Sequence, residues 1–244
     1  PPTIDNKEKS SDLNPFDNKA PINNVDNQQS EDRINNIKLV RVSEYAQLFG
    51  ESLFLSIFIG TFISFCFIHI LNFSFKTIGL KYLNDDAFVT FVGSVGAAIN
   101  GASRFVVGLI FQNYGYLPVG VSVLVIQFTL ALTYLWLAHN KLTYFLATSL
   151  YEVSFGFVVG LGPLLLDQFY KNRGAMIYSY NQSSTTLSVI FSLTGYSYIK
   201  MWYGELVSFM VLAVMILFSI PVIIVIARAD RQTKRNNTEL GTPK

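Results

Sequence analysis

The sequence has very few of the side chains that bind metal ions or form disulfides. Among 244 residues it contains one cysteine, Cys66, and two histidines, His69 and His139. One cysteine permits no internal disulfide, and two histidines do not supply the paired clusters of membrane metal enzymes. A G-x-S-x-G nucleophile turn is also missing, and no histidine follows His139. We therefore expect no metal site, no cofactor and no enzyme activity.

Charge is equally scarce. Charged residues make up 14% of the chain and the formal net charge is +2, whereas 51% of the residues are hydrophobic. So small a net charge does not predict a nucleic-acid partner. The TVGYG filter and a repeating arginine helix are missing, which argues against a voltage-gated potassium channel. What the chain does have is apolar residues in long runs, a composition typical of a membrane protein.

The composition changes sharply near residue 45. Residues 1–44 hold clusters of Asn, Asp and Gln with few large apolar side chains, so they cannot bury enough surface to order the chain. They also lack the basic start and apolar core of a signal peptide. We predict a disordered cytoplasmic linker over 1–44, a six-helix transmembrane domain over 45–228 and a cytoplasmic tail over 229–244. The polar start further predicts that another membrane half precedes Pro1.

Six apolar stretches are long enough to cross a bilayer, which takes about 20 residues of helix. Backbone polar groups in lipid must be satisfied within the segment, so an all-α membrane protein is predicted. The stretches are 49–72, 87–111, 117–138, 142–166, 176–199 and 204–227. Short joints between them predict antiparallel neighbours.

Lysine and arginine predict the orientation, because they favour the cytoplasmic side. Six spans put both ends of the segment on one side of the membrane. That side carries Arg33, Lys38, Arg41, Lys171, Arg173, Arg228, Arg231, Lys234 and Arg235. The opposite side carries Lys76, Lys81, Lys141 and Lys200. We predict that both termini face the cytoplasm.

Two ionisable residues fall inside the predicted spans, where they are expensive and are candidates for function. Glu152 lies near the middle of the fourth span, too deep for its short side chain to reach water. It either faces a wet cavity, pairs with a cation, or is a protonated carboxyl hydrogen-bonded within the bundle. Arg104 lies nearer the cytoplasmic end of the second span and shares a helix face with Asn100. Snorkelling of Arg104 to the interface is the alternative to a place on a cavity wall.

Small residues in the second span predict where another helix packs. Gly93, Ala97 and Gly101 form a stripe at four-residue spacing, close to the face that carries Asn100 and Arg104. Such a stripe lets a second backbone approach closely. The pattern predicts a helix that packs on one side and presents polar groups beside the contact.

The stretches from Asn100 to Gly115 and from Tyr151 to Gly174 resemble parts of major facilitator transporters of the oxalate/formate antiporter and monocarboxylate transporter branches. NGASRFVVGLIFQNYG, from Asn100 to Gly115, is similar to the eighth helix and its loop, with Gly108 and Gly115 in place. YEVSFGFVVGLGPLLLDQFYKNRG, from Tyr151 to Gly174, is similar to the tenth helix and the loop after it. Asp167 and Arg173 stand in that second loop, whereas the first loop lacks the family's Asp and Arg residues at 112–116.

The resemblance implies half of a twelve-helix fold, with six helices arranged as two inverted three-helix repeats and a missing N-terminal six-helix half of the same chain. It implies a secondary transporter, by symport or antiport, with a small organic anion bound between the halves. Candidate substrate-binding residues are Arg104, Asn100, Tyr151, Asn181 and Gln182, with Arg104 attracting a carboxylate and Glu152 carrying a coupled proton. The span 176–199 has no Lys or Arg, which favours a monocarboxylate or an uncharged solute over a dianion. A non-transporting receptor-like or scaffold protein and a six-helix oligomeric channel stay open as alternatives.

Overall fold

Apolar sequence and short polar joints define the helices of the computed structural model, which describes residues 47–171 and 173–239. The chain divides into two units, Pro1–Gln47 and Leu48–Lys244, and the helices described below belong to the second. The predicted linker 1–44 lies outside the described residues, as do residues 240–244 of the predicted tail. Within the described part of the chain every regular element is a helix.

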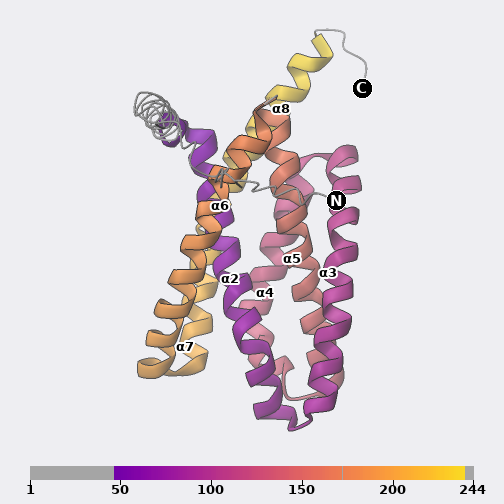
Figure 1. Ribbon diagram of the computed structural model, residues 1–244, viewed down its shortest axis with the longest axis vertical. Helices are drawn as coiled ribbons and strands as arrows, with labels where there is room; N and C mark the ends of the chain where they lie inside the picture. Colours follow the sequence, from indigo (N-terminus) through magenta and orange to yellow (C-terminus); the bar gives the residue numbers. More distant parts are fainter. Residues whose placement is uncertain (1–46, 172, 240–244) are drawn as a thin grey trace, which may run out of the picture. The chain divides into compact units, whose positions relative to one another are not determined.

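The helices follow one another with almost no connecting residues (Figure 1). Their bounds are α2 Ser52–Leu83, α3 Asp86–Tyr114, α4 Tyr116–Leu137, α5 Lys141–Phe169, α6 Gly174–Phe191, the π-helical turn η1 Ser192–Tyr196, α7 Ser197–Leu217 and α8 Ser219–Glu239. Five helical stretches, the last running from Gly174 to Arg235, are long and apolar enough to cross a membrane. By length and composition the chain is therefore a multi-pass α-helical membrane protein.

The fifth and sixth predicted spans lie in that last stretch. Gly204 has φ 86° and ψ 172°. This backbone conformation is not helical, and its positive φ favours glycine. The ribbon turns back on itself within α7 (Figure 1). The turn falls at the boundary predicted between Lys200 and Gly204, so the last of the five stretches contains both predicted spans 176–199 and 204–227. The arrangement as two inverted repeats stays a prediction.

The first joint is much shorter than the sequence indicated. Residues 73–86 were expected to connect two spans, but α2 continues to Leu83. Asn84 then ends the helix in the left-handed conformation, and the Asp85 carboxylate caps α3 by accepting a hydrogen bond from Phe88 N at 3.0 Å. Lys76 and Lys81 lie within α2 and do not end it, because the long side chains of lysines in the last turns of a helix can reach polar surroundings.

Acidic residues pair with the lysines at this end of the helices. Glu205, just after the Gly204 turn, accepts from Lys81 at 3.0 Å and from Lys200 at 2.9 Å, which ties α2 to α7. Lys141 at the start of α5 pairs with Asp85. The hydrogen bonds from Lys141 and from the Phe88 backbone lower the pKa of the Asp85 carboxyl. Ion pairs thus connect the α2–α3 joint, the start of α5 and the Gly204 turn at this end of the helices.

The core lies between α2, α3, α4, α5 and α7 and is rich in buried tyrosines. Tyr134, Tyr144 and Tyr151 are at most 1% exposed, and each hydroxyl has a partner on another helix. By contrast many large apolar side chains point outward, among them Phe105 on α3, which is 81% exposed. An outer surface of this kind suits acyl chains rather than water.

Candidate functional site

The closest helix contact in the candidate region is the crossing of α3 and α5. A Cβ added at Gly156 would lie 2.6 Å from the backbone oxygen of Asn100, and one at Gly160 would lie 3.0 Å from the backbone oxygen of Arg104. The two glycines are four residues apart and form a G-x-x-x-G face, which lets backbones approach closely. The crossing therefore fixes the α3 turn that carries Asn100 and Arg104 directly against α5.

The packing face of α3 is not the stripe expected from the sequence. Gly101 is exposed, with nothing within 4 Å of an added Cβ, and Ala97 is also exposed. The buried face instead carries Gly96, Asn100, Ser103, Val107 and Phe111. An added Cβ at Gly96 would lie 2.9 Å from Cγ of Glu152, so this glycine makes room for the carboxylate.

Three polar side chains form a relay across this crossing. Asn100 Nδ2 donates to Glu152 Oε2 at 3.1 Å, and Arg104 Nε donates to Asn100 Oδ1 at 3.0 Å. Asn100 is buried, Glu152 is half-buried and Arg104 is exposed. The structure thus brings together the three residues that the sequence singled out, and Asn100 stands between the arginine and the carboxylate.

The orientation of Arg104 bears on the snorkelling alternative. Its hydrogen bond goes to Asn100, one helical turn further from the Tyr114 end of α3. Arg104 lies ten residues, or about 15 Å, from that end. The side chain is thus held toward the middle of the span. A guanidinium has five N–H donors, and those other than Nε–H make no hydrogen bond to the described part of the chain.

Helix α6 carries a row of polar side chains, of which Tyr178 is within electrostatic range of Arg104. Arg104 interacts electrostatically with Tyr178 as well as with Glu152. Gln182 donates to the Tyr178 hydroxyl at 2.6 Å, and Thr185 donates to Gln182 Oε1 at 3.0 Å. We call Arg104, Asn100, Glu152, Tyr178 and Gln182 the polar cluster. Tyr178 lies on the same helix as Gln182, which the sequence predicted as a substrate-binding residue.

Two residues predicted for the site lie elsewhere. Tyr151 is fully buried and donates to the backbone oxygen of Ile68 at 3.2 Å, so its ring packs between α5 and α2. Asn181 is 1% exposed and donates to the Thr61 hydroxyl at 3.3 Å, on the face of α6 that meets α2. Both connect helices within the unit, whereas the polar cluster includes exposed groups.

The predicted loop residues lie at the opposite end from the Asp85 joint. Gly115 has φ 84° and joins α3 to α4, and Gly108 lies half-buried beside Leu164 of α5. Asp167 and Arg173 flank the joint between α5 and α6 and are exposed. A Cβ added at Gly174 would lie 2.6 Å from Cα of Asp167, so this joint is also tightly folded.

Sequence reasoning missed the residue that connects these joints. Asp230 of α8 is only 4% exposed. Its Oδ2 accepts from Tyr116 N at 3.2 Å and its Oδ1 accepts from Gln168 Nε2 at 2.7 Å, while Lys234 lies 3.6 Å away. The carboxylate therefore holds the start of α4 and the end of α5 to α8. The feature of the sequence that could have pointed to Asp230 is its position as an aspartate within a basic tail.

Comparisons with protein-family profiles, with curated proteins and with solved structures found no match. The class stated above, a multi-pass α-helical membrane protein, therefore rests on the helices themselves.

Proposed function

We propose that this chain is the membrane half of a secondary active transporter that moves a small organic anion, a monocarboxylate, by alternating access. The observation that carries the proposal is the exposed guanidinium of Arg104, held in place by Asn100 with its other donors unused by the described residues. A carboxylate accepts two parallel N–H bonds from a guanidinium, which makes arginine well suited to recognise it. In this role the protein binds and moves its solute without chemical change, as a carrier and not an enzyme.

The depth of Arg104 supports a water-filled surface in front of it. Arg104 lies seven residues, or about 10 Å, inside the predicted span 87–111, and a charged side chain that faces acyl chains at that depth is unfavourable, so such residues face protein or water-filled cavities. The exposed and half-buried groups beside it, Glu152, Tyr178 and Gln182, are polar as well. A polar surface of this kind suits the inner wall of a two-half carrier, with a second six-helix half opposite.

Glu152 supplies a means of coupling in this proposal. Its carboxylate reaches Arg104 through Asn100, so a substrate anion that binds Arg104 adds negative charge close to Glu152. Added negative charge favours protonation of a neighbouring carboxylate. Proton and anion would then move together. A protonated Glu152 that only stabilises the bundle is the alternative reading of the same hydrogen bond.

The distribution of charge supports an orientation with both ends of this segment in the cytoplasm. Lys76, Lys81, Lys141 and Lys200 each form an ion pair with Asp or Glu at one end of the helices. The other end carries the basic residues of the α5–α6 joint and of α8, most of them exposed. An excess of Lys and Arg is typical of the cytoplasmic side.

Glu152→Gln tests the coupling. We expect uptake of a radiolabelled monocarboxylate into proteoliposomes holding the full-length protein to respond to an imposed pH gradient. This response should be lost in Glu152→Gln, because an amide can still accept the hydrogen bond from Asn100 but cannot carry a proton.

Asp86→Asn is the matched control, since Asp86 is an exposed carboxylate at the start of α3 that pairs with Lys76. Uptake by Glu152→Gln that still follows the gradient assigns the coupling to another group. No carboxylate uptake by any of the three proteins would favour a different solute, a receptor-like role or an oligomeric channel.

A further inference from the structure

A second polar feature lies inside the unit and is formed by residues outside the polar cluster. A partly open cavity of about 70 Å³ is lined by residues of α2, α4, α5 and α8. Its walls are mostly aliphatic, from residues such as Ile57, Leu161 and Ile223, but Gln127 of α4 also lines it. Gln127 lies about 16 Å along α4 from Tyr116, well inside the span.

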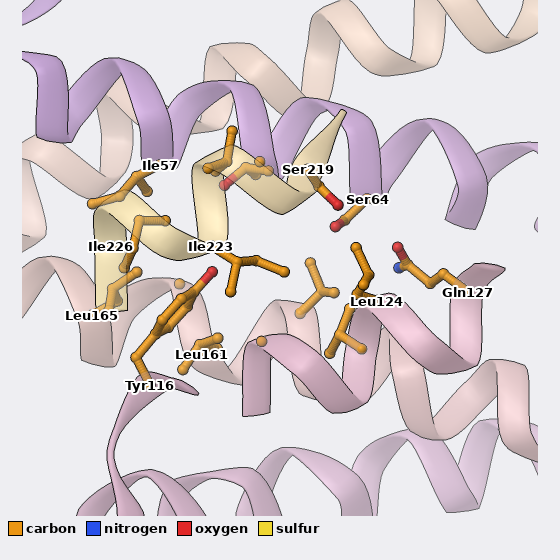
Figure 2. Close-up of a pocket in the computed structure, with 17 residues that line it drawn as sticks. Ile57, Ser64, Tyr116, Leu124, Gln127, Leu161, Leu165, Ser219, Ile223 and Ile226 are labelled. Atoms are coloured by element: carbon orange, nitrogen blue, oxygen red, sulfur yellow. The ribbon is translucent and has the colours of Figure 1, made fainter. Parts of the chain in front are cut away.

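Gln127 has an unmet hydrogen-bonding need. The residue is 1% exposed, and its Nε2 has no hydrogen-bond partner within the described residues. Buried amide groups without a partner are rare, because removing them from water is unfavourable unless a partner replaces the water. Figure 2 shows the ends of Gln127, Ser64 and Ser219 pointing toward one another at one end of the cavity.

Ser219 and Gln127 differ in what they offer a ligand. The Ser219 hydroxyl donates to the backbone oxygen of Ile216 at 2.6 Å, so its oxygen is left as an acceptor. The Gln127 Nε2 is a donor. A ligand that fits must therefore accept from one group and donate to another within a small volume. Water does both, and its share of liquid volume is about 30 Å³, so the cavity has room for a small number of molecules.

We propose that this cavity is a hydration site, in which ordered water held by Gln127, Ser64 and Ser219 connects α4 to α2 and α8. The inference does not depend on the transport proposal, because none of these residues belongs to the polar cluster. In this proposal Gln127 holds water in the gap between α4 and the neighbouring helices, to which its Nε2 makes no direct hydrogen bond within the described residues.

Hydroxyl-radical footprinting of the full chain in lipid nanodiscs tests this proposal. Ionising radiation turns bound water into radicals that oxidise the nearest side chains, and methionine is a sensitive reporter. Leu124→Met places a reporter on the cavity wall one turn from Gln127, and Leu71→Met is the matched control at a fully buried core position. Both are conservative changes of similar volume.

We expect oxidation at Leu124→Met but not at Leu71→Met. When the protein is mixed with water labelled with a heavy oxygen isotope just before irradiation, the label should appear in the oxidised side chain of Leu124→Met only after a delay, because bound water exchanges slowly with the bulk. Adding Gln127→Leu should remove the oxidation, whereas adding Ser122→Ala, on the exposed side of α4, should not. Equal oxidation of the two reporters, or oxidation that survives Gln127→Leu, would overturn the proposal. If adding Gln127→Leu unfolds the chain, Leu71→Met also becomes oxidised, and the delay of isotope uptake at Leu124→Met in the otherwise unchanged chain then decides, because a site oxidised by bulk water would show no delay.

Discussion

Arg104→Gln should abolish or nearly abolish carboxylate uptake. The substitution removes the positive charge but leaves a side chain that can still bond Asn100. A hydrogen bond to a charged group contributes about 1.5–3 kcal/mol, which corresponds to a roughly ten- to hundredfold loss of affinity for the anion. Loss of the charge also removes the counter-charge near Glu152. Initial rates of uptake over a range of substrate concentrations measure the effect.

Lys171→Gln is the control for this prediction. Lys171 is an exposed cation in the joint between α5 and α6, outside the polar cluster. Its loss should leave uptake close to that of the unchanged protein. Retained uptake in Arg104→Gln, at the same protein density in the vesicles, would exclude Arg104 as the charge that recognises the substrate and would leave snorkelling or helix packing as its role.

Gly156→Ala should destabilise the helix bundle although alanine is the better helix former. The new Cβ would lie 2.6 Å from both the Asn100 backbone oxygen and Ser103 Cβ, so α3 and α5 must separate. Overpacking of this kind costs about 1–3 kcal/mol, which corresponds to a fall of roughly 2–4 °C in Tm for each kcal/mol in a chain of this size. Thermal unfolding in detergent measures the shift.

Gly101→Ala is the matched comparison, because Gly101 is also a glycine inside a helix but has nothing within 4 Å of an added Cβ. There the greater helix propensity of alanine, worth about 1 kcal/mol, is unopposed, so Tm should stay the same or rise. A lower Tm for Gly101→Ala than for Gly156→Ala would mean that the stripe expected from the sequence, and not the observed crossing, is the packing face.

That pair of glycines also shows what the sequence could predict. The existence of the spans followed from their hydropathy, because lipid requires long apolar helices whatever their packing. The packing face of α3 did not follow, since Gly93–Ala97–Gly101 and Gly96–Asn100–Ser103 are both plausible stripes on one helix. The choice between them depends on Gly156 and Gly160 of α5, and such a pairing between distant segments is not visible in either helix alone.

The candidate site was predicted in part for a similar reason. Asn100 and Arg104 lie four residues apart, so their hydrogen bond is a local consequence of helix geometry. The contact from Asn100 to Glu152 joins residues that are 52 positions apart in the sequence. It could be predicted only from the crossing of α3 and α5, which the sequence does not show. Tyr151 directly precedes Glu152, yet it faces the core, because adjacent helix positions point about 100° apart.

The central claim is that Arg104 faces water within the membrane. Cysteine accessibility tests it most directly, since the chain has one natural cysteine, Cys66, which is fully buried. Arg104→Cys and Phe105→Cys are compared in proteoliposomes of the full-length protein with a charged thiosulfonate reagent. Both positions are exposed in the structure, but only the first belongs to the polar cluster. We predict rapid modification of Arg104→Cys and none of Phe105→Cys or of the unchanged protein. An Arg104→Cys protein as unreactive as Phe105→Cys would contradict the water-filled surface and, with it, the proposed binding of an anion there.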